Sequence, residues 1–251
     1  MFKPKPAPRI PNHLRWLLSA LLCVAGTAAF AQDSSSGRQK EKRFESKTNP
    51  PAGIAYLLYL PAGYQGSEKR WPLMLFLHGS GESGTNLARV KAHGPPKVVE
   101  SKSDFPFILV SPQSPGHGWN AELLSELLDQ IQHDYKVDPD RVYLTGLSMG
   151  GFGTWSLAAK HPERFAAVVP ICGGGNTNDA PKLAKLPIWV FHGAQDKTVP
   201  PERSKAMVEA LKAAGGQPQF TLYPDAGHDS WTATYNNPEL YEWLLKQKRA
   251  P

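Results

Sequence analysis

TGLSMGG, at residues 145–151, places a serine between two glycines that each stand two positions away from it. An apolar, β-branched run precedes this stretch and a helix-like run follows it. A Gly-x-Ser-x-Gly sequence between a strand and a helix is typical of a nucleophile elbow, a tight and strained turn that exposes the serine. Gly146 and Gly150 suit this turn because a Cβ at either position would collide where strand and helix cross. The stretch nominates Ser148 as a nucleophile, which needs a base, an acid and an oxyanion site.

Strand and helix signals alternate along the chain on both sides of this stretch. Short apolar runs bounded by Gly or Pro predict strands at residues 54–60, 73–77, 107–111, 142–145, 166–170, 188–191 and 220–223. Helical patterns fit residues 150–161, 201–214 and 238–248, and the clearest helix follows Asn120, a potential N-cap, with an apolar stripe over residues 123–131.

This alternation predicts an α/β fold, with a mostly parallel central sheet and helices on both faces. In such a fold, ligands bind at the carboxyl ends of the strands. Hydrolases of this architecture often carry a cap domain at the position of residues 172–186, but here that stretch is short and rich in Gly, Asn and Lys. We therefore expect no sizeable cap domain and a fairly open site.

Residues 1–31 have the pattern of a signal peptide. A basic region without acidic residues is followed by an apolar stretch at residues 16–30, and Ala29-Phe30-Ala31 gives the small-x-small pattern of a cleavage site. An uncleaved anchor is disfavoured because about 15 apolar residues are fewer than a membrane-spanning helix needs. We expect cleavage after Ala31, export to the periplasm or the medium, and no stable membrane anchor in the mature protein.

The mature chain is predicted to hold one domain. Residues 32–46 are polar and are predicted to be disordered, and residues 47–251 form the α/β domain. The formal net charge of +6 falls to +2 without residues 1–31, which carry four basic side chains, and no basic patch remains to indicate a nucleic acid partner. Cys172 is the single cysteine outside residues 1–31, so no internal disulfide is expected and a buried, inert thiol is the default.

The base is expected to follow the nucleophile along the chain, with the acid between them. Three histidines follow Ser148, namely His161, His192 and His228. His161 stands at a helix end before a proline, and His192 ends a predicted strand. His228 lies in the turn-rich loop after the last predicted strand, at the edge of the sheet from which its imidazole can reach Ser148. We therefore assign His228 as the base.

Spacing alone leaves the orienting acid open between three carboxylates. Asp196 follows the strand at residues 188–191, one strand before the histidine, whereas Asp225 and Asp229 are close to His228 in sequence. Residues three apart on a tight loop rarely place a carboxylate behind the Nδ1 atom of the histidine. This argument favours Asp196, and Asp225 suits a role in shaping its turn.

The oxyanion site needs two backbone N–H donors. One is expected from Met149, which follows the nucleophile at a helix start. The other is expected from the loop HGSGESG at residues 78–84, where the Ser80 N–H is our candidate. No Gly-Lys-Ser/Thr follows these glycines, so the pattern is not that of a phosphate-binding loop. Glu82 is a candidate to bind a substrate hydroxyl or to support the oxyanion loop.

Two tryptophans, Trp119 and Trp231, stand in predicted loops at the same edge of the sheet. Either is a candidate to stack on a sugar or aryl ring of a substrate, and either can equally serve packing.

Together these motifs resemble the α/β-hydrolase superfamily. Within it they are similar to compact exported serine esterases related to the prolyl-oligopeptidase-type, phospholipase/carboxylesterase, and feruloyl and acetyl-xylan esterase groups. The resemblance covers about residues 54–246 and rests on YLP at 59–61, LHGSGE at 77–82, GLSMGG at 146–151, FHGAQD at 191–196 and DAGHDSW at 225–231.

The resemblance implies that Ser148 is the nucleophile, Asp196 the acid and His228 the base, without a metal or a cofactor. It also implies that HGPP, at residues 93–96, belongs to a loop near the site, and no chemistry is assigned to this loop. The chain departs from oligopeptidases of this group because it has no room for their N-terminal propeller. It departs from dienelactone hydrolases because its elbow carries serine and not cysteine.

The expected function is that of a secreted serine carboxylesterase acting through an acyl-enzyme on Ser148. Small-molecule or carbohydrate esters, including acetyl or feruloyl esters of plant polysaccharide, are the expected substrates. A small serine peptidase of the prolyl-oligopeptidase type is one alternative, and a non-catalytic carbohydrate-binding relic is another. The sequence carries no signal of the oligomeric state.

Overall fold

A computed structural model describes residues 1–3, 37–47, 52–102 and 104–249. The chain divides into two compact units, Met1–Gln32 and Asp33–Pro251, and the second contains every helix and strand considered below. The expected signal peptide, apart from its first three residues, lies outside the described residues. No helix in the described ranges is long and apolar enough to cross a membrane.

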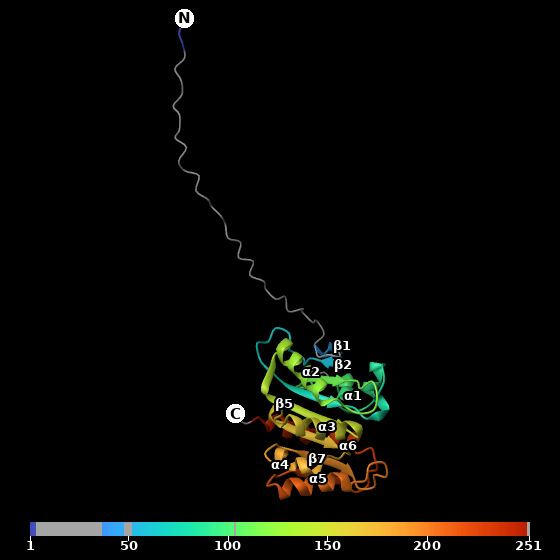
Figure 1. Ribbon diagram of the computed structural model, residues 1–251. Helices are drawn as coiled ribbons and strands as arrows, with labels where there is room; N and C mark the ends of the chain where they lie inside the picture. The colour runs from blue at the N-terminus through green and yellow to red at the C-terminus, as the bar shows by residue number, and fades with distance from the viewer. Residues whose placement is uncertain (4–36, 48–51, 103, 250–251) are drawn as a thin grey trace. The chain divides into compact units, whose positions relative to one another are not determined.

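The second unit is built on a sheet that has eight strands within the described residues, in the order β1-β2-β4-β3-β5-β6-β7-β8 (Figure 1). The strands are β1 Gln39–Glu45, β2 Gly53–Tyr59, β3 Trp71–Leu77, β4 Ile108–Pro112, β5 Val137–Leu147, β6 Ala167–Ile171, β7 Trp189–Gly193 and β8 Gln219–Tyr223. The pairs β1/β2 and β2/β4 are antiparallel, and the other pairs are parallel. The predicted mostly parallel sheet is confirmed.

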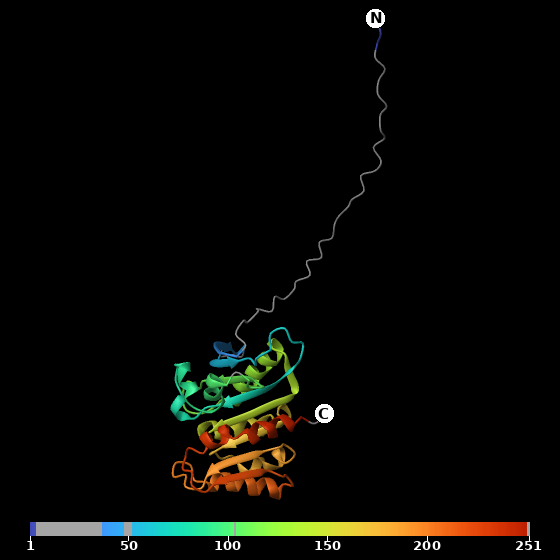
Figure 2. The ribbon, with the colours of Figure 1, turned by 180° about the vertical axis from the view of Figure 1, so that it is seen from behind.

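Helices cover both faces of the sheet, as predicted. They are α1 Gly94–Ser101, α2 Ala121–Asp134, α3 Met149–Lys160, α4 Ala180–Leu183, α5 Glu202–Ala213, α6 Trp231–Asn236 and α7 Pro238–Lys246. Short 3₁₀ helices lie at η1 Ser80–Glu82, η2 Leu87–Ala92, η3 Pro162–Arg164 and η4 Thr177–Asp179. In the view from behind, α7, the red helix next to the C-terminus, lies in front of the sheet (Figure 2).

Alternating side chains of the central strands divide the core in two. Leu73 and Leu75 of β3 belong to a cluster that includes side chains of α2, α3 and α5. Met74 and Phe76 point the other way and belong to a cluster that includes side chains of α1, α6 and α7. Because each strand is buried on both faces, its sequence is almost continuously apolar, which is why these strands were readable from the sequence.

The amino-terminal boundary of the domain differs from the prediction. The described part of the segment expected to be disordered, residues 32–46, contains strand β1 over Gln39–Glu45, which pairs with β2 along its whole length. Its sequence QKEKRFE is charged because an edge strand needs few apolar side chains, and Phe44, 9% exposed, is the one that enters the core. The α/β domain therefore includes residues 39–46 and does not begin at residue 47.

Two further elements differ from the sequence-based expectation. Residues 93–96 were assigned to a loop, but helix α1 begins at Gly94, with prolines at its first positions. Trp231 was placed in a loop, but it is the first residue of α6. Between residues 172 and 186 the structure has only η4 and α4, so the expectation of no sizeable cap is confirmed.

Candidate active site

Ser148 stands between the end of β5 and the start of α3, in a backbone conformation of φ 53° and ψ −118°. A positive φ is strained for a non-glycine residue, as a nucleophile elbow requires. A Cβ added at Gly146 would lie 2.4 Å from the carbonyl oxygen of Gly150, and one added at Gly150 would lie 1.9 Å from the carbonyl oxygen of Leu77. Both contacts are with backbone, so the predicted reason for the two glycines is confirmed.

The three residues predicted as nucleophile, base and acid form a hydrogen-bonded chain. The Ser148 Oγ lies 2.9 Å from the His228 Nε2, and the His228 Nδ1 lies 2.7 Å from the Asp196 Oδ2. The residues come from the β5–α3 turn, the loop after β8 and the loop after β7, all at the carboxyl ends of strands. A carboxylate only accepts hydrogen bonds, so Nδ1 carries the proton and Nε2 is free to accept the serine proton.

Asp196 is held in place as an ionised, oriented carboxylate. Its side chain is fully buried, and its Oδ1 accepts hydrogen bonds from the N–H groups of Thr198, at 2.8 Å, and Val199, at 2.9 Å. Burial raises the pKa of Asp196, but the hydrogen bonds from His228 and from these two N–H groups lower it by more, so the pKa lies below its usual value. Asp196 is therefore ionised across the neutral range.

Among the described residues, the hydrogen-bond partner of the His228 Nδ1 is Asp196, and neither of the two rival carboxylates takes that place. Asp225 is exposed, and Asp229 accepts hydrogen bonds from the N–H and the hydroxyl of Thr232, at 3.0 and 2.9 Å. His192 is also excluded as the base because it is buried, with its Nδ1 2.7 Å from the Ser204 Oγ and its Nε2 2.9 Å from the Val199 carbonyl oxygen. His192 thus packs under the Asp196 loop.

The predicted oxyanion loop lies beside the nucleophile. A Cβ added at Gly79 would be 3.6 Å from the Ser148 Cβ, and η1 begins at the next residue, Ser80. Helix α3 begins at Met149, and the first N–H groups of a helix have no acceptor within it. The assignment of the Ser80 and Met149 N–H groups as the oxyanion donors stays a prediction, and the close approach of the two segments supports it.

Glu82 stabilises this loop through hydrogen bonds of its side chain and its backbone. Its Oε2 accepts a hydrogen bond from the Gly79 N–H at 3.0 Å, and its carbonyl oxygen accepts one from the Gln113 Nε2 at 2.8 Å. The side chain is only 10% exposed. Of the two roles considered for Glu82, these contacts favour support of the loop, and contact with a substrate hydroxyl stays a prediction.

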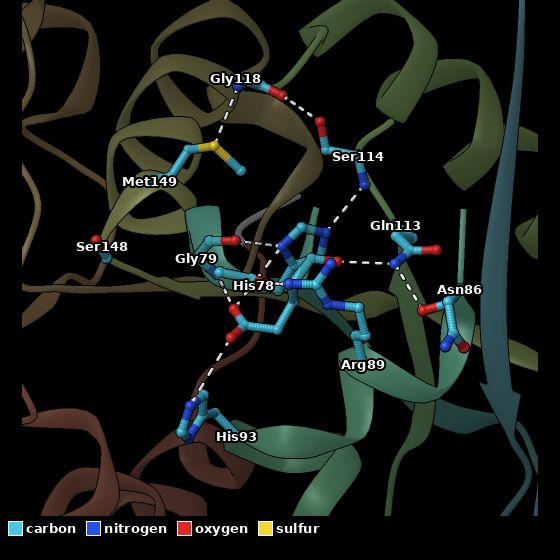
Figure 3. Close-up of polar contacts among 12 residues, drawn as sticks. His78, Gly79, Asn86, Arg89, His93, Gln113, Ser114, Gly118, Ser148 and Met149 are labelled. Carbon is cyan, nitrogen blue, oxygen red and sulfur yellow. Dashed lines mark hydrogen bonds and ion pairs between the residues drawn. The ribbon is translucent and has the colours of Figure 1, made fainter. Parts of the chain in front are cut away.

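His78 supports the same loop, and sequence reasoning assigned it no role. Its Nε2 accepts a hydrogen bond from the Ser114 N–H at 3.0 Å, and its Nδ1 bonds the Gly79 carbonyl oxygen (Figure 3). Burial lowers the pKa of His78 to about 4, with a smaller lowering by Arg89 and an opposing hydrogen bond to Gly79. The ring is therefore neutral, with the proton on Nδ1. Its place in the His-Gly pair directly after a strand was the only signal in the sequence.

Trp119 packs against the active-site framework. Its ring lies 4.8 Å from the ring of His78, and a Cβ added at Gly153 would come within 2.5 Å of it. An open pocket of about 440 Å³ lies beside it, lined by Gly118, Trp119, Met149, Phe152, Gly153 and Ser156. The Met149 Sδ accepts a hydrogen bond from the Gly118 N–H at 3.1 Å (Figure 3). This pocket reaches the residue next to the nucleophile, and substrate binding by Trp119 stays a prediction.

Trp231 packs against the base. Its ring is perpendicular to that of His228, with centroids 5.2 Å apart, and it also meets the ring of His93 at 5.5 Å. It thereby restricts the orientation of the imidazole, and a direct contact with substrate stays a prediction.

Cys172 lies close to Asp196 and His228. It is fully buried, and its Sγ is within 4.8 Å of donor atoms of Asp196 and His228. Burial raises the pKa of the thiol to about 12, so it remains protonated and a poor nucleophile. Its predicted burial is confirmed.

Comparisons with known proteins agree with this geometry. The Dienelactone hydrolase family matches residues 117–241. A probable feruloyl esterase C of Aspergillus niger is 27% identical, over 88% of this chain and 82% of its own length.

Solved structures give the same fold. A thermostable esterase superposes with a TM-score of 0.70 at 33% identity, covering 83% of this chain, while this chain spans 63% of that protein. The acylaminoacyl peptidase of Pyrococcus horikoshii has a TM-score of 0.62 at 15% identity, over 84% of this chain and 42% of its own, a likeness of fold alone. The fold, the elbow and these relatives agree that the chain belongs to the α/β-hydrolase superfamily, as a hydrolase of ester bonds.

Proposed function

We propose that the protein is an exported serine carboxylesterase that works through an acyl-enzyme on Ser148. The observation that carries the proposal is the chain of contacts from the Ser148 Oγ to the His228 Nε2, at 2.9 Å, and from the His228 Nδ1 to Asp196, at 2.7 Å. This arrangement of nucleophile, base and orienting acid is the one that acyl transfer requires.

Acylation begins when the Ser148 Oγ attacks the ester carbonyl carbon while His228 takes the hydroxyl proton at Nε2. The carbonyl oxygen becomes an oxyanion, which the N–H groups of Ser80 and Met149 stabilise. Collapse of this intermediate breaks the bond to the alcohol, and His228 returns the proton to the leaving oxygen. Asp196 holds the imidazole and stabilises its charged form throughout.

Deacylation repeats these steps with water. His228 removes a proton from the water as it attacks the acyl carbon, and then protonates the Ser148 Oγ as it leaves. The products are a carboxylic acid and an enzyme ready for the next ester. The protonated Cys172 thiol takes no part, because its burial disfavours the thiolate.

Esters of aromatic or carbohydrate character are the proposed substrates. Support comes from the pocket of about 440 Å³ beside Met149, which Trp119 and Phe152 line. Aromatic side chains of this kind stack on aryl or sugar rings. Several relatives carry names of the same chemistry, including an endo-1,4-beta-xylanase/feruloyl esterase of Xylanibacter ruminicola, 28% identical over 81% of this chain and 31% of that protein.

Substitution of the nucleophile tests the proposed reaction. Ser148→Ala is expected to abolish hydrolysis of p-nitrophenyl acetate and methyl ferulate, and to abolish labelling by a fluorophosphonate probe, because both need the Oγ. Ser101→Ala, which changes an exposed serine at the last position of α1, serves as the matched control and is expected to keep the labelling. A fully active Ser148→Ala protein would contradict the acyl-enzyme, and faster cleavage of amides than of esters would favour a peptidase.

Export is tested separately. The basic and apolar pattern of residues 1–31 supports it. Expression of the full chain in a Gram-negative bacterium is expected to give a mature protein outside the cytoplasm whose amino-terminal residue is Gln32. A protein that stays in the cytoplasm with residues 1–31 attached would contradict this part of the proposal.

A further inference from the structure

His93 stands at the active site without a part in the reaction described so far. It is the residue that precedes α1, and its side chain is 36% exposed. Its Nε2 lies 3.8 Å from the Oε1 of Glu82, and its ring packs against Trp231 at 5.5 Å. Trp231 in turn packs against the ring of His228. The imidazole of His93 therefore lies between Glu82, which holds the predicted oxyanion loop, and Trp231, which packs on the proposed base. Figure 3 labels His93 and marks its ion pair with a dashed line.

Glu82 poses an electrostatic problem for the proposed reaction. Its Oε2 bonds the Gly79 N–H at 3.0 Å, and Gly79 borders the nucleophile. A carboxylate at this place repels the oxyanion that forms on the substrate, and it does so more strongly because its side chain is only 10% exposed. The loop gains an acceptor for its N–H but also gains a negative charge close to the reacting oxygen. A neighbouring donor that faces the carboxylate would reduce this cost.

Two imidazoles approach Glu82 within 4.0 Å, and their situations differ. The Nδ1 of His78 lies 4.0 Å from the Oε2, but it bonds the Gly79 carbonyl oxygen, and its Nε2 accepts the Ser114 N–H. The His78 ring is therefore neutral, and its single N–H already donates to the Gly79 carbonyl oxygen, so it has no further hydrogen for Glu82. His93 has its Nε2 toward the other carboxylate oxygen at 3.8 Å, an ion-pair distance that is longer than a hydrogen bond, and the hydrogen bonds of the described residues give this nitrogen no other partner.

The nearby basic side chains have other partners. Arg89 donates to the Gly81 carbonyl oxygen, and Lys91 lies 3.2 Å from a carboxylate oxygen of Glu100. In the described part of the chain, His93 is thus the side chain best placed to offset the charge of Glu82.

We propose that His93 is a positioning residue, which directs its Nε2–H at Glu82 and so balances the charge of that carboxylate beside the oxyanion. The proposal rests on the serine esterase reaction above. In that reaction, Glu82 holds the loop in shape, and His93 reduces the repulsion between the Glu82 carboxylate and the negative charge of the transition state. His93 acts through Glu82, so it affects the chemical step more than the binding of the substrate.

Two substitutions of His93 separate this role from packing. His93→Ala removes both the Nε2–H and the ring that meets Trp231, whereas His93→Phe keeps an aromatic ring but has no donor. Both are expected to lower kcat for p-nitrophenyl acetate about tenfold with KM changed less than about twofold, since the lost interaction matters mainly in the transition state. If His93→Phe keeps the kcat of the wild type, ring packing is sufficient and the proposal is overturned.

A double-mutant cycle with Glu82→Gln gives the decisive readout. The amide oxygen of glutamine can still accept the Gly79 N–H, but the side chain has no charge to balance. His93→Ala is therefore expected to lower kcat about tenfold in the wild-type background and less than about twofold in the Glu82→Gln background. Equal losses in the two backgrounds would show that His93 acts independently of Glu82 and would overturn the proposal.

His133 offers a matched control. Its Nδ1 lies 2.8 Å from the Oδ1 of Asp134, and its side chain is 85% exposed near the end of α2. His133→Ala thus removes a histidine beside a carboxylate away from the site, and kcat is expected to stay unchanged. Circular dichroism of all variants checks folding. Loss of activity in Ser148→Ala together with unchanged kcat in both His93 variants would overturn this inference alone, whereas an active Ser148→Ala would overturn the proposed function.

Discussion

At the scale of single residues, Asp196 has the most sharply defined task in the proposed reaction. Its Oδ2 fixes the proton of His228 on Nδ1, and its Oδ1 is fixed by the N–H groups of Thr198 and Val199. Asp196→Asn is expected to lower kcat by about 10³–10⁴, because an amide can donate to Nδ1 and favour the wrong tautomer of the ring. Steady-state hydrolysis of p-nitrophenyl acetate measures the effect, with KM expected to change little.

Asp225→Asn is the matched control for this substitution. Asp225 is exposed and stands three residues before His228, so it was a rival on sequence spacing. It is expected to keep the kcat of the wild type within about twofold, as surface substitutions outside a site usually do. A large loss in Asp225→Asn with little loss in Asp196→Asn would reverse the assignment of the acid.

The predictability of the site residues depended on chain order. Ser148, Asp196 and His228 follow one another in the order that this architecture requires, so the sequence was sufficient to nominate them. No such rule covers His78, whose partner Ser114 is 36 positions away and bonds through its backbone. The pairing of His93 with Glu82 was equally hidden, since the start of a helix, not a sequence motif, brings the two together.

At the scale of elements, the crossing of β5 and α3 over the end of β3 determines where the nucleophile stands. Gly150→Ala is expected to destabilise the protein by more than about 3 kcal/mol or to prevent folding, because its Cβ would lie 1.9 Å from the Leu77 carbonyl oxygen and backbone cannot move aside cheaply. Urea unfolding followed by circular dichroism measures this.

Gly116→Ala provides the comparison. A Cβ there meets nothing within 4 Å, and its φ is not in the left-handed region. This variant is expected to stay within about 1 kcal/mol of the wild type. A stable and fully active Gly150→Ala protein would contradict the steric account of the elbow.

Elements with a continuously apolar sequence were predictable, whereas the charged edge strand β1 and the helix α1, which opens with prolines, were not. Strands such as β3 and β6 are continuously apolar, which gives them an unmistakable pattern. Strand β1 pairs on one side only, so its charged sequence was indistinguishable from that of a disordered tail. Helix α1 is only Gly94–Ser101 and opens with Gly-Pro-Pro, a sequence that also fits a loop.

At the scale of the whole molecule, the sheet separates two apolar clusters and brings the site to one edge. The proposed triad and the predicted oxyanion loop both lie where strands of the sheet end, so the stability of the core and the geometry of the site are connected. His78 links the two, because it is a fully buried titratable group whose Nδ1 hydrogen-bonds the Gly79 carbonyl oxygen in the predicted oxyanion loop.

The stability of the whole molecule is therefore expected to depend on pH through His78. Its pKa is lowered from the ordinary 6.5 to about 4, so between these values the unfolded chain binds a proton that the folded chain does not. The contribution of the neutral His78 ring to the free energy of unfolding is fully present above pH 6.5. It is lost as the pH decreases toward 4, and the total loss is about 3 kcal/mol. The lowered pKa of Asp196 acts in the same direction but only at lower pH, near and below its ordinary 3.8.

Urea unfolding at pH 7.0 and pH 4.5 tests this dependence. The free energy of unfolding of the wild type is expected to fall by about 2–3 kcal/mol more than that of His78→Gln, which keeps an acceptor for the Ser114 N–H but cannot be protonated in this range. The comparison uses the difference between two pH values, so any loss of stability that the substitution causes at both values cancels. Equal decreases in the two proteins would mean that His78 accepts a proton without unfolding, and that the neutral ring is not required to hold the oxyanion loop.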